Sequence, residues 1–183
     1  MLIGLTGKYA AGKGTVAEAL KAQGFGYHSC SDILREELRA RGVAESRESL
    51  LALGNELRRA GGPGELARRL TPRLQDGANH IVDSIRNPAE VEALRTLQGF
   101  VLIAVDASPE VRFTRLRARA RIGDPETYEA FQALEARELA SDDPTTQQLT
   151  ATIALADHHL QNDAGVDELH DALTRLLTML GRA

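Results

Sequence analysis

Residues 7–15 set the architecture of this chain, and they read Gly7-Lys8-Tyr9-Ala10-Ala11-Gly12-Lys13-Gly14-Thr15. They follow an apolar run, residues 2–6, that predicts a buried strand, and they open a predicted helix over residues 13–22. Glycines let the backbone wrap closely around a phosphate chain, while successive N–H groups and the helix N-terminus point at the anion. We therefore predict a nucleotide site in which the ammonium of Lys13 reaches the outer phosphates. The predicted binding residues are Gly7, Ala10, Ala11, Gly12, Lys13, Gly14 and Thr15.

The composition is that of an ordinary globular domain. Of 183 residues, 43% are hydrophobic and 26% are charged, so one domain can bury a core without disulfides or a structural metal. The net charge of −4 argues against a nucleic-acid polymer as partner. Cys30 is the single cysteine, which excludes an internal disulfide and fits a reducing compartment, and we interpret it as a packing residue. No apolar run approaches the ~20 residues that cross a bilayer, so we expect no membrane association and a cytoplasmic location.

Predicted strands and helices alternate along the chain. Further strands are predicted at 25–28, 81–85, 100–105 and 158–161, and helices at 31–41, 46–60 and 166–180. A capping residue followed by proline predicts helix starts at Asn87-Pro88, Ser108-Pro109, Asp124-Pro125 and Asp143-Pro144. This alternation predicts an α/β fold, with a parallel sheet covered on both faces and ligands at the carboxyl ends of the strands. Residues 31–76 contain helices but no obvious strand, which indicates a helical insert.

The Gly-Lys-Gly-Thr ending of the loop resembles that of adenylate kinase and its nucleoside monophosphate kinase relatives, a family that also includes dephospho-coenzyme A kinase-like members. The resemblance implies a three-layer P-loop NTPase fold with a five-stranded parallel sheet. It implies a core of residues 1–30, 77–114 and 145–183, a helical acceptor-binding arm at 31–76 and a short arginine-rich lid in 115–144. In the commoner loop pattern Ser or Thr follows the lysine directly and holds magnesium. Gly14 stands there in this chain, so Thr15 is expected to touch phosphate or a magnesium-bound water.

Asp83 ends a predicted strand beside the expected phosphate site, where a carboxylate can hold the waters of a magnesium ion. The alternative interpretation is a helix cap or a solvated strand end. The segment Asp83-Ser84-Ile85-Arg86 is similar to an Asp-Gly-Phe-Pro-Arg type segment of the monophosphate kinases, with Ser84-Ile85 in place of Gly-Phe. The resemblance implies that Arg86 contacts phosphate and belongs to both the catalytic and the acceptor-binding residues.

The acceptor side is predicted at the start of the helical insert. Ser29 to Arg35 resembles the beginning of the acceptor arm of these kinases, where an Asp opens a helix and an Arg one turn later holds the acceptor phosphate. Asp32 and Arg35 match in order and spacing. Arg58, on the next helix with Asn55 and Arg59, is a further candidate for the acceptor pocket. The alternatives are a first-turn helix acid for Asp32, a solvated side chain for Arg35 and an exposed basic face around Arg58.

Five arginines fall within ten residues, at 112, 115, 117, 119 and 121. Planar guanidinium groups suit the charge that spreads over the equatorial oxygens during phosphoryl transfer. Arg115, Arg119 and Arg121 are our candidates for a closing lid, and a surface helix paired with acids is the alternative. By analogy of fold, Asn162 and Gly165 are expected in the loop that contacts the adenine.

The function predicted from the sequence is ATP- and Mg2+-dependent phosphoryl transfer to a nucleotide monophosphate or a similar phosphate-bearing small molecule. The catalytic candidates are Lys13, Asp83, Arg86, Arg115, Arg119 and Arg121, and the candidates near the metal are Thr15 and Asp83. A dephospho-coenzyme A kinase is the rival enzyme, with Asp32 as the base that a hydroxyl acceptor would need. A nucleotide-sensing regulatory module without transfer activity is the rival of another class. We expect a monomer or a weak homodimer.

Overall fold

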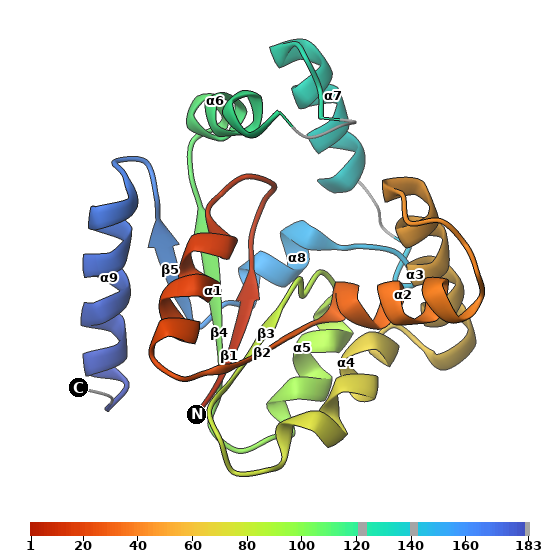
Figure 1. The fold of residues 1–183 in the computed structure, drawn as a ribbon, viewed down its shortest axis with the longest axis horizontal. Helices are drawn as coiled ribbons and strands as arrows, with labels where there is room; N and C mark the ends of the chain where they lie inside the picture. The colour runs from red at the N-terminus through yellow and green to blue at the C-terminus, as the bar shows by residue number, and fades with distance from the viewer. Residues whose placement is uncertain (121–123, 140–142, 182–183) are drawn as a thin grey trace.

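A five-stranded parallel sheet forms the centre of the molecule (Figure 1). The computed structural model describes residues 1–120, 124–139 and 143–181. The strands lie in the order β2-β3-β1-β4-β5. Their bounds are Leu2–Thr6 (β1), Gly26–Ser29 (β2), His80–Asp83 (β3), Phe100–Asp106 (β4) and His158–Gln161 (β5). The predicted α/β fold class with a five-stranded parallel sheet is confirmed.

Helices cover both faces of this sheet and give three layers. Side chains alternate along each strand, so Leu2 packs in the core beneath the insert helices while Ile3 packs in the core beneath α1 and α9. The first part of the chain contributes α1 (Lys13–Ala22), α2 (Cys30–Ala40), α3 (Arg47–Gly61), α4 (Glu65–Leu70) and the 3-10 helix η1 (Thr71–Leu74). The second part contributes α5 (Pro88–Arg95), α6 (Pro109–Arg119), α7 (Tyr128–Leu139), α8 (Leu149–Ala154) and α9 (Val166–Met179).

Two of the four proline-marked helix starts are right and two are wrong. The side chains of Asn87 and Glu90 form a reciprocal capping box at the start of α5, and α6 begins at Pro109. After Asp124-Pro125 the helix begins only at residue 128, because the Asp124 carboxylate is bonded to Arg119 and Tyr9. After Asp143 the chain makes a turn, in which the Asp143 carboxylate accepts from the N–H of Thr145 at 2.8 Å.

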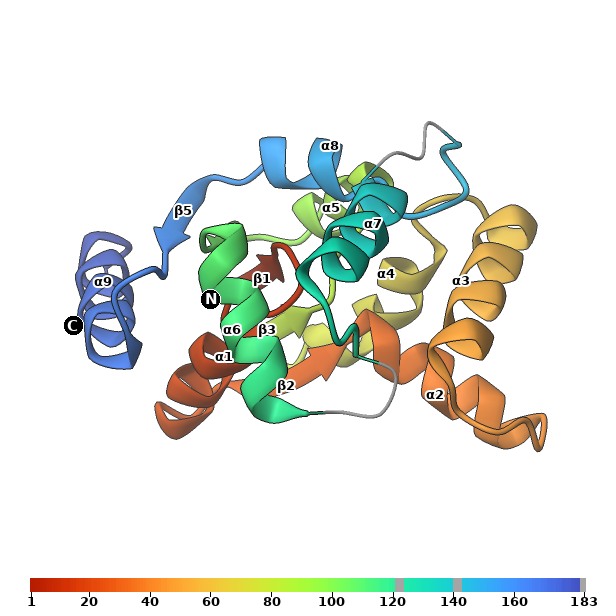
Figure 2. The same ribbon diagram turned by 90° about the horizontal axis from the view of Figure 1, so that it is seen from above.

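Two helical segments stand over the carboxyl ends of the strands. The insert, residues 30–74, lies to one side of the sheet, and its α3 and α4 share a core with β1, β3 and α5. Helices α6 and α7 lie above the phosphate loop and reach toward the insert (Figures 1 and 2). The carboxyl ends of the strands therefore have helical segments on two sides (Figures 1 and 2).

No helix in the described part of the chain combines the length and the apolar character needed to span a membrane.

Candidate active site

The phosphate loop connects β1 to α1 and its shape depends on two glycines. Gly7 and Gly12 have φ values of 138° and 111°, a region that favours glycine. A Cβ on Gly7 would lie 2.0 Å from the carbonyl oxygen of Val105, and one on Gly12 would lie 2.2 Å from Nδ2 of Asn162. Between them Ala10 also has a positive φ, of 60°. The loop is therefore held in a strained, specific shape by the strands beneath it.

Lys13 lies across the loop that it follows. Its ammonium donates to the carbonyl oxygens of Gly7 at 2.7 Å and of Lys8 at 2.9 Å. The positive charge is thus kept over the mouth of the loop, where a phosphate chain would find it. A Cβ on Gly14 would meet nothing within 4 Å, so among the described residues the space beside the first turn of α1 is open.

The loop between β5 and α9 supports the phosphate loop from one side. Asn162 is 5% exposed, and its Nδ2 donates to the carbonyl oxygen of Ala11 at 2.8 Å. Its Oδ1 accepts from Nη2 of Arg115 at 3.1 Å. Gly165, also predicted to contact the nucleotide, precedes the first residue of α9. Asn162 therefore links three segments that are far apart in the sequence.

Asp83 lies at the carboxyl end of β3, the strand next to the edge strand β2, as the sequence indicated for the end of a strand. Its Oδ1 accepts from the N–H of Ser84 at 2.6 Å, and its Oδ2 accepts from the hydroxyl of Tyr27 at 3.0 Å. Ser84 has a φ of 63°, a left-handed conformation that is uncommon for residues other than glycine. Burial and the adjoining Asp83 carboxylate raise the pKa of the Tyr27 phenol well above its ordinary value, so the phenol stays protonated and keeps donating.

Arg86 follows the same strand and holds the chain that returns from α7. Its Nη1 donates to Oε1 of Gln147 at 3.0 Å, and its carbonyl oxygen accepts from the N–H of Gln148 at 2.8 Å. The side chain of Asn87 donates to the carbonyl oxygens of Pro144 and Thr146, both at 2.8 Å. The residues after Asp83 therefore anchor one end of the segment predicted as a lid.

Helix α6 places two of its predicted lid arginines against the phosphate loop. Arg115 reaches the loop through Asn162, and Arg119 stacks on the ring of Tyr9, with its guanidinium carbon 4.2 Å from the ring centroid. Arg117, on another face of the helix, is exposed. Arg121, the third predicted lid residue, lies outside the described residues.

Arg112 has a role that the sequence did not indicate. It is 0% exposed, and its guanidinium forms a two-pronged ion pair with Glu135 of α7, one contact of which is Nη2 to Oε2 at 3.0 Å. Its Nε donates to the carbonyl oxygen of Ala107 at 2.9 Å. The guanidinium also faces the ring of Phe131 at 5.3 Å. This arginine fastens α7 to α6, and no sequence pattern separates it from its four neighbours.

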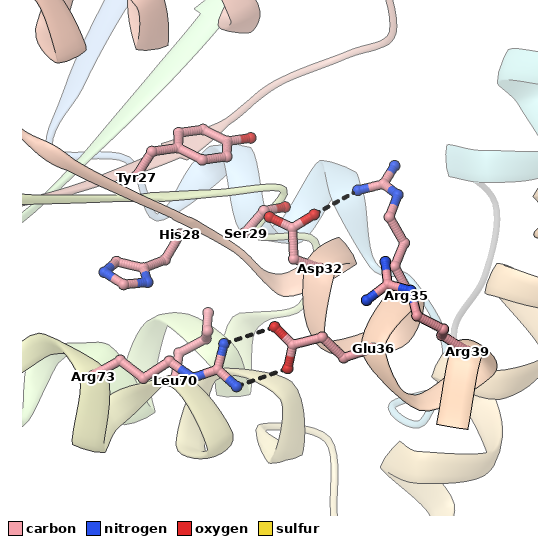
Figure 3. Close-up of a pocket in the computed structure, with 9 residues that line it drawn as sticks. All are labelled: Tyr27, His28, Ser29, Asp32, Arg35, Glu36, Arg39, Leu70 and Arg73. Atoms are coloured by element: carbon pink, nitrogen blue, oxygen red, sulfur yellow. Dashed lines mark hydrogen bonds and ion pairs between the residues drawn. The ribbon is translucent and has the colours of Figure 1, made fainter. Parts of the chain in front are cut away.

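Asp32 and Arg35 lie on one face of α2 and border a surface pocket of about 250 Å³ (Figure 3). Arg35 donates to Asp32 at 2.8 Å and to Glu45 at 2.9 Å. Across the pocket, Arg73 of η1 forms a fork with Glu36 of α2. The pocket is lined mainly by charged and polar groups, which suits an anionic ligand able to exchange with these ion pairs. Its wall Tyr27 connects it to Asp83.

Arg58 does not face this pocket, contrary to its predicted place in acceptor binding. It is 3% exposed and donates to Oε1 of Glu90, itself 0% exposed, from Nη2 at 2.7 Å and from Nε at 3.1 Å. The other oxygen of Glu90 accepts from the N–H groups of Arg86 and Asn87. Arg58 thus stabilises the turn after β3 from within. Cys30 is buried, as predicted for a packing residue, and burial raises the pKa of its thiol.

The described residues contain no cluster of three or more His, Cys, Asp or Glu side chains that could hold a metal ion by itself. Asp83 and Thr15 offer one carboxylate and one hydroxyl for the predicted metal position. This set fits Mg2+ held mainly by phosphate and water, which is the usual way proteins bind it beside nucleotides. It does not fit a tightly held structural ion.

Comparison with known proteins supports the fold. Residues 3–133 match a family model described as an AAA domain. A UPF0200 protein from Hyperthermus butylicus is 34% identical over 182 residues, which are 98% of this chain and 95% of that protein. Shikimate kinase from Bacteroides thetaiotaomicron has a TM-score of 0.65 at 16% identity, over 99% of this chain and 98% of its own. A sugar kinase from Janibacter sp. HTCC2649 has a TM-score of 0.60 at 17% identity, over 100% of this chain and 95% of its own. Both structures share the fold, and the predicted resemblance to P-loop kinases is confirmed.

Proposed function

This chain belongs to the AAA domain family and to the family of UPF0200 proteins, and we propose that it is an ATP-dependent kinase of a small phosphate-bearing molecule such as a nucleoside monophosphate. One observation carries the proposal. Two arginines one helical turn apart, Arg115 and Arg119, converge on the phosphate loop from α6. A protein that only bound a nucleotide would need the loop and Lys13, whereas guanidinium groups held above the loop suit the charge that develops during transfer.

The chemistry needs little beyond positioning and charge. The acceptor oxygen attacks the γ-phosphorus of ATP, the bond from that phosphorus to the bridging oxygen breaks, and ADP leaves. Loop amides and Lys13 hold the outer phosphates, and Arg119 and Arg115 neutralise the equatorial oxygens. Nη1 of Arg115 is buried without a hydrogen-bond partner among the described residues, so a ligand oxygen would relieve its desolvation. Bound Mg2+ would supply further positive charge, and Asp83, which Tyr27 and Ser84 hold in place, would accept hydrogen bonds from its waters.

A phosphate-bearing acceptor accounts for the arginines of α2 and of the segment after β3. Arg35 lines the pocket beside α2 and Arg86 follows Asp83 along the chain, and each now holds a partner that an anionic ligand could replace. A phosphate oxygen is already anionic, so the transfer requires no strong general base. A hydroxyl acceptor would require one, and an oxygen of Asp32, the candidate base, already accepts from Arg35 at 2.8 Å.

The decisive experiment is a coupled assay of ADP release with two acceptor sets, ribo- and deoxynucleoside monophosphates on one side and dephospho-coenzyme A on the other. Turnover of a monophosphate that exceeds ATP hydrolysis without acceptor supports the proposal. Turnover of dephospho-coenzyme A alone would replace it with the hydroxyl-transfer reaction. Saturable ATP binding without transfer to either set would instead identify a nucleotide-sensing module.

Arg119→Ala tests the catalytic role of the lid, with Arg117→Ala as the matched control. Removal of one preorganised charge donor from a transfer site costs about 10²–10³ in kcat, so Arg119→Ala is expected to lose that much while its affinity for ATP changes little. Arg117 is exposed on the same helix, and its removal is expected to leave kcat unchanged. Equal losses of binding and turnover in Arg119→Ala would contradict the role.

A further inference from the structure

Tyr9 is the third residue of the phosphate loop, and its ring is the place where three separate segments meet. The guanidinium of Arg119, at the end of α6, lies 4.2 Å from the ring centroid. The guanidinium of Arg47, the first residue of α3, lies 5.1 Å from it. The phenolic hydroxyl donates to Oδ1 of Asp124 at 2.8 Å. One side chain of the loop thus contacts the lid helix, the chain beyond that helix and the insert.

These contacts form a closed triangle around Arg119. Asp124 accepts from Nε of Arg119 at 3.0 Å and from Nη2 at 3.2 Å, and the same carboxylate accepts from Tyr9. The ring contacts the guanidinium on one face, while the carboxylate accepts from its Nε and Nη2, so the two contacts together restrain its position. Nη1 takes no part in the triangle, so this edge of Arg119 can serve a phosphate oxygen without breaking either contact.

The triangle is partly shielded from water, which strengthens its contacts. Asp124 has a side-chain exposure of 8% and Arg119 one of 26%. Burial and the hydrogen bond to Asp124 raise the pKa of the Tyr9 phenol, so its hydroxyl remains a donor at every pH at which the protein would work. The main chain of Tyr9 is held as well, since its carbonyl oxygen accepts from Nη1 of Arg112 at 3.5 Å.

We propose that Tyr9 is a positioning residue for phosphoryl transfer, which holds Arg119 against the phosphate loop before substrates bind and so preorganises it for the transferring group. This inference rests on the proposed function. In this role Tyr9 affects turnover only through Arg119, and it does not itself contact the reacting atoms. A loop side chain with a purely structural role would instead affect nucleotide affinity and turnover alike.

The kinetic test is a double-mutant cycle of Tyr9→Leu and Arg119→Ala. Tyr9→Leu removes both the stacking and the hydrogen bond, and we expect kcat to fall about 10-fold while KM for ATP stays within about 2-fold. The double variant should be no slower than Arg119→Ala alone, because Tyr9 acts only through that arginine. Losses that multiply, or a Tyr9→Leu variant that loses ATP affinity with kcat retained, would overturn the proposal.

Two conservative changes sharpen the test. Tyr9→Phe keeps the stacked ring and loses only the bond to Asp124, so it should retain most of kcat. Tyr128→Phe is the matched control, since it removes a hydroxyl that donates to Glu110 at 3.0 Å elsewhere on the same helical pair. It should behave as the unchanged protein. A Tyr9→Phe variant as slow as Tyr9→Leu would exclude ring stacking as the means of positioning.

A measurement that needs no activity separates this inference from the proposed function. Limited trypsin digestion of the protein without ligands should cleave after Arg117 and Arg119 several-fold faster in Tyr9→Leu than in Tyr128→Phe, because the end of α6 is no longer held. If no acceptor is ever phosphorylated, the proposed kinase function is wrong, but the difference in cleavage rate still tests whether Tyr9 restrains Arg119. Equal cleavage rates in the two variants would show that it does not.

Discussion

The phosphate loop and helix α6 face each other across the candidate active site, and they are built in opposite ways. In the loop, the predicted binding depends on the main chain, since Gly7 and Gly12 permit a shape that side chains would block. In α6, the role that we propose for each arginine depends on the neighbour that it contacts. Arg112 is buried against Glu135, Arg115 bonds Asn162, Arg117 is exposed and Arg119 stacks on Tyr9.

This contrast explains why the phosphate loop can be predicted from the sequence and the arginine contacts of α6 cannot. A main-chain site needs particular residue types at fixed spacing, so its signal is local. A side-chain site on a helix takes its meaning from partners brought by the fold. Arginines of identical chemistry within a single helix therefore have different roles, and the predictions below test that division.

Arg112→Ala should produce the largest effect, and it falls on stability. The change leaves the Glu135 carboxylate without its partner in a mostly buried position, which costs roughly 3 kcal/mol. Urea unfolding monitored by circular dichroism measures the loss, with Arg117→Ala as the control that should lie within about 0.5 kcal/mol of the unchanged protein. Similar stability for both variants would show that the buried ion pair of Arg112 contributes no more to folding than the exposed Arg117.

Gly12→Ala should come next and should damage both stability and binding. The new Cβ is incompatible with a φ of 111° and would collide with the amide of Asn162, so we expect a loss of about 2 kcal/mol. Affinity for a fluorescent ATP analogue should fall more than about 10-fold, because the loop amides are displaced. Unchanged affinity would mean that the loop shape does not determine the site.

Gly14→Ala is the matched glycine in the same loop, and its effect on stability should have the opposite sign. Gly14 lies in the first turn of α1 and its Cβ position is open, so alanine should stabilise the protein by about 0.5–1 kcal/mol. Binding of the same ATP analogue should nevertheless weaken, because the added methyl group occupies space that a phosphate approaches. Stronger or equal binding would show that no ligand comes close to Gly14.

The smallest expected effect is on the stability of the folded protein, and it comes from His28 on the acceptor side and depends on pH. Burial, then the neighbouring His80 and Arg73, lower the pKa of His28 below its ordinary value, while Asp76 and Asp32 oppose the shift. The unfolded chain therefore takes up a proton first as the pH falls through about 6.5, and the folded state loses stability from there downward.

His28→Gln should remove that loss and reduce the fall in melting temperature between pH 7.5 and 5.5 by on the order of 1 °C. Differential scanning fluorimetry at both pH values measures the difference. His170→Gln, on the exposed side of α9, is the control and should leave it unchanged. An equal reduction in both variants would assign the effect to overall charge.

Local signals predicted most of the fold. The strand candidates and the helices after the loop and at the end of the chain were placed almost to the residue, because hydrophobic periodicity and caps act over a few positions. One of the two wrong helix starts came where a capping residue had a distant partner, and the other where the capping residue closed a local turn instead. Asp124 bonds Tyr9 across 115 positions, so it does not start a helix.

The residues of the candidate site likewise fall into those that local sequence predicts and those that depend on distant partners. The phosphate loop and the end of β3 follow from residue types and spacing alone, since each is a short segment whose chemistry lies in its own main chain. Tertiary structure determines the positions of Arg58 and Arg112. Arg58 pairs with Glu90, 32 positions away, and Arg112 pairs with Glu135, 23 positions away. A buried charge must be paired where it lies, and only the packed chain determines which acid is there.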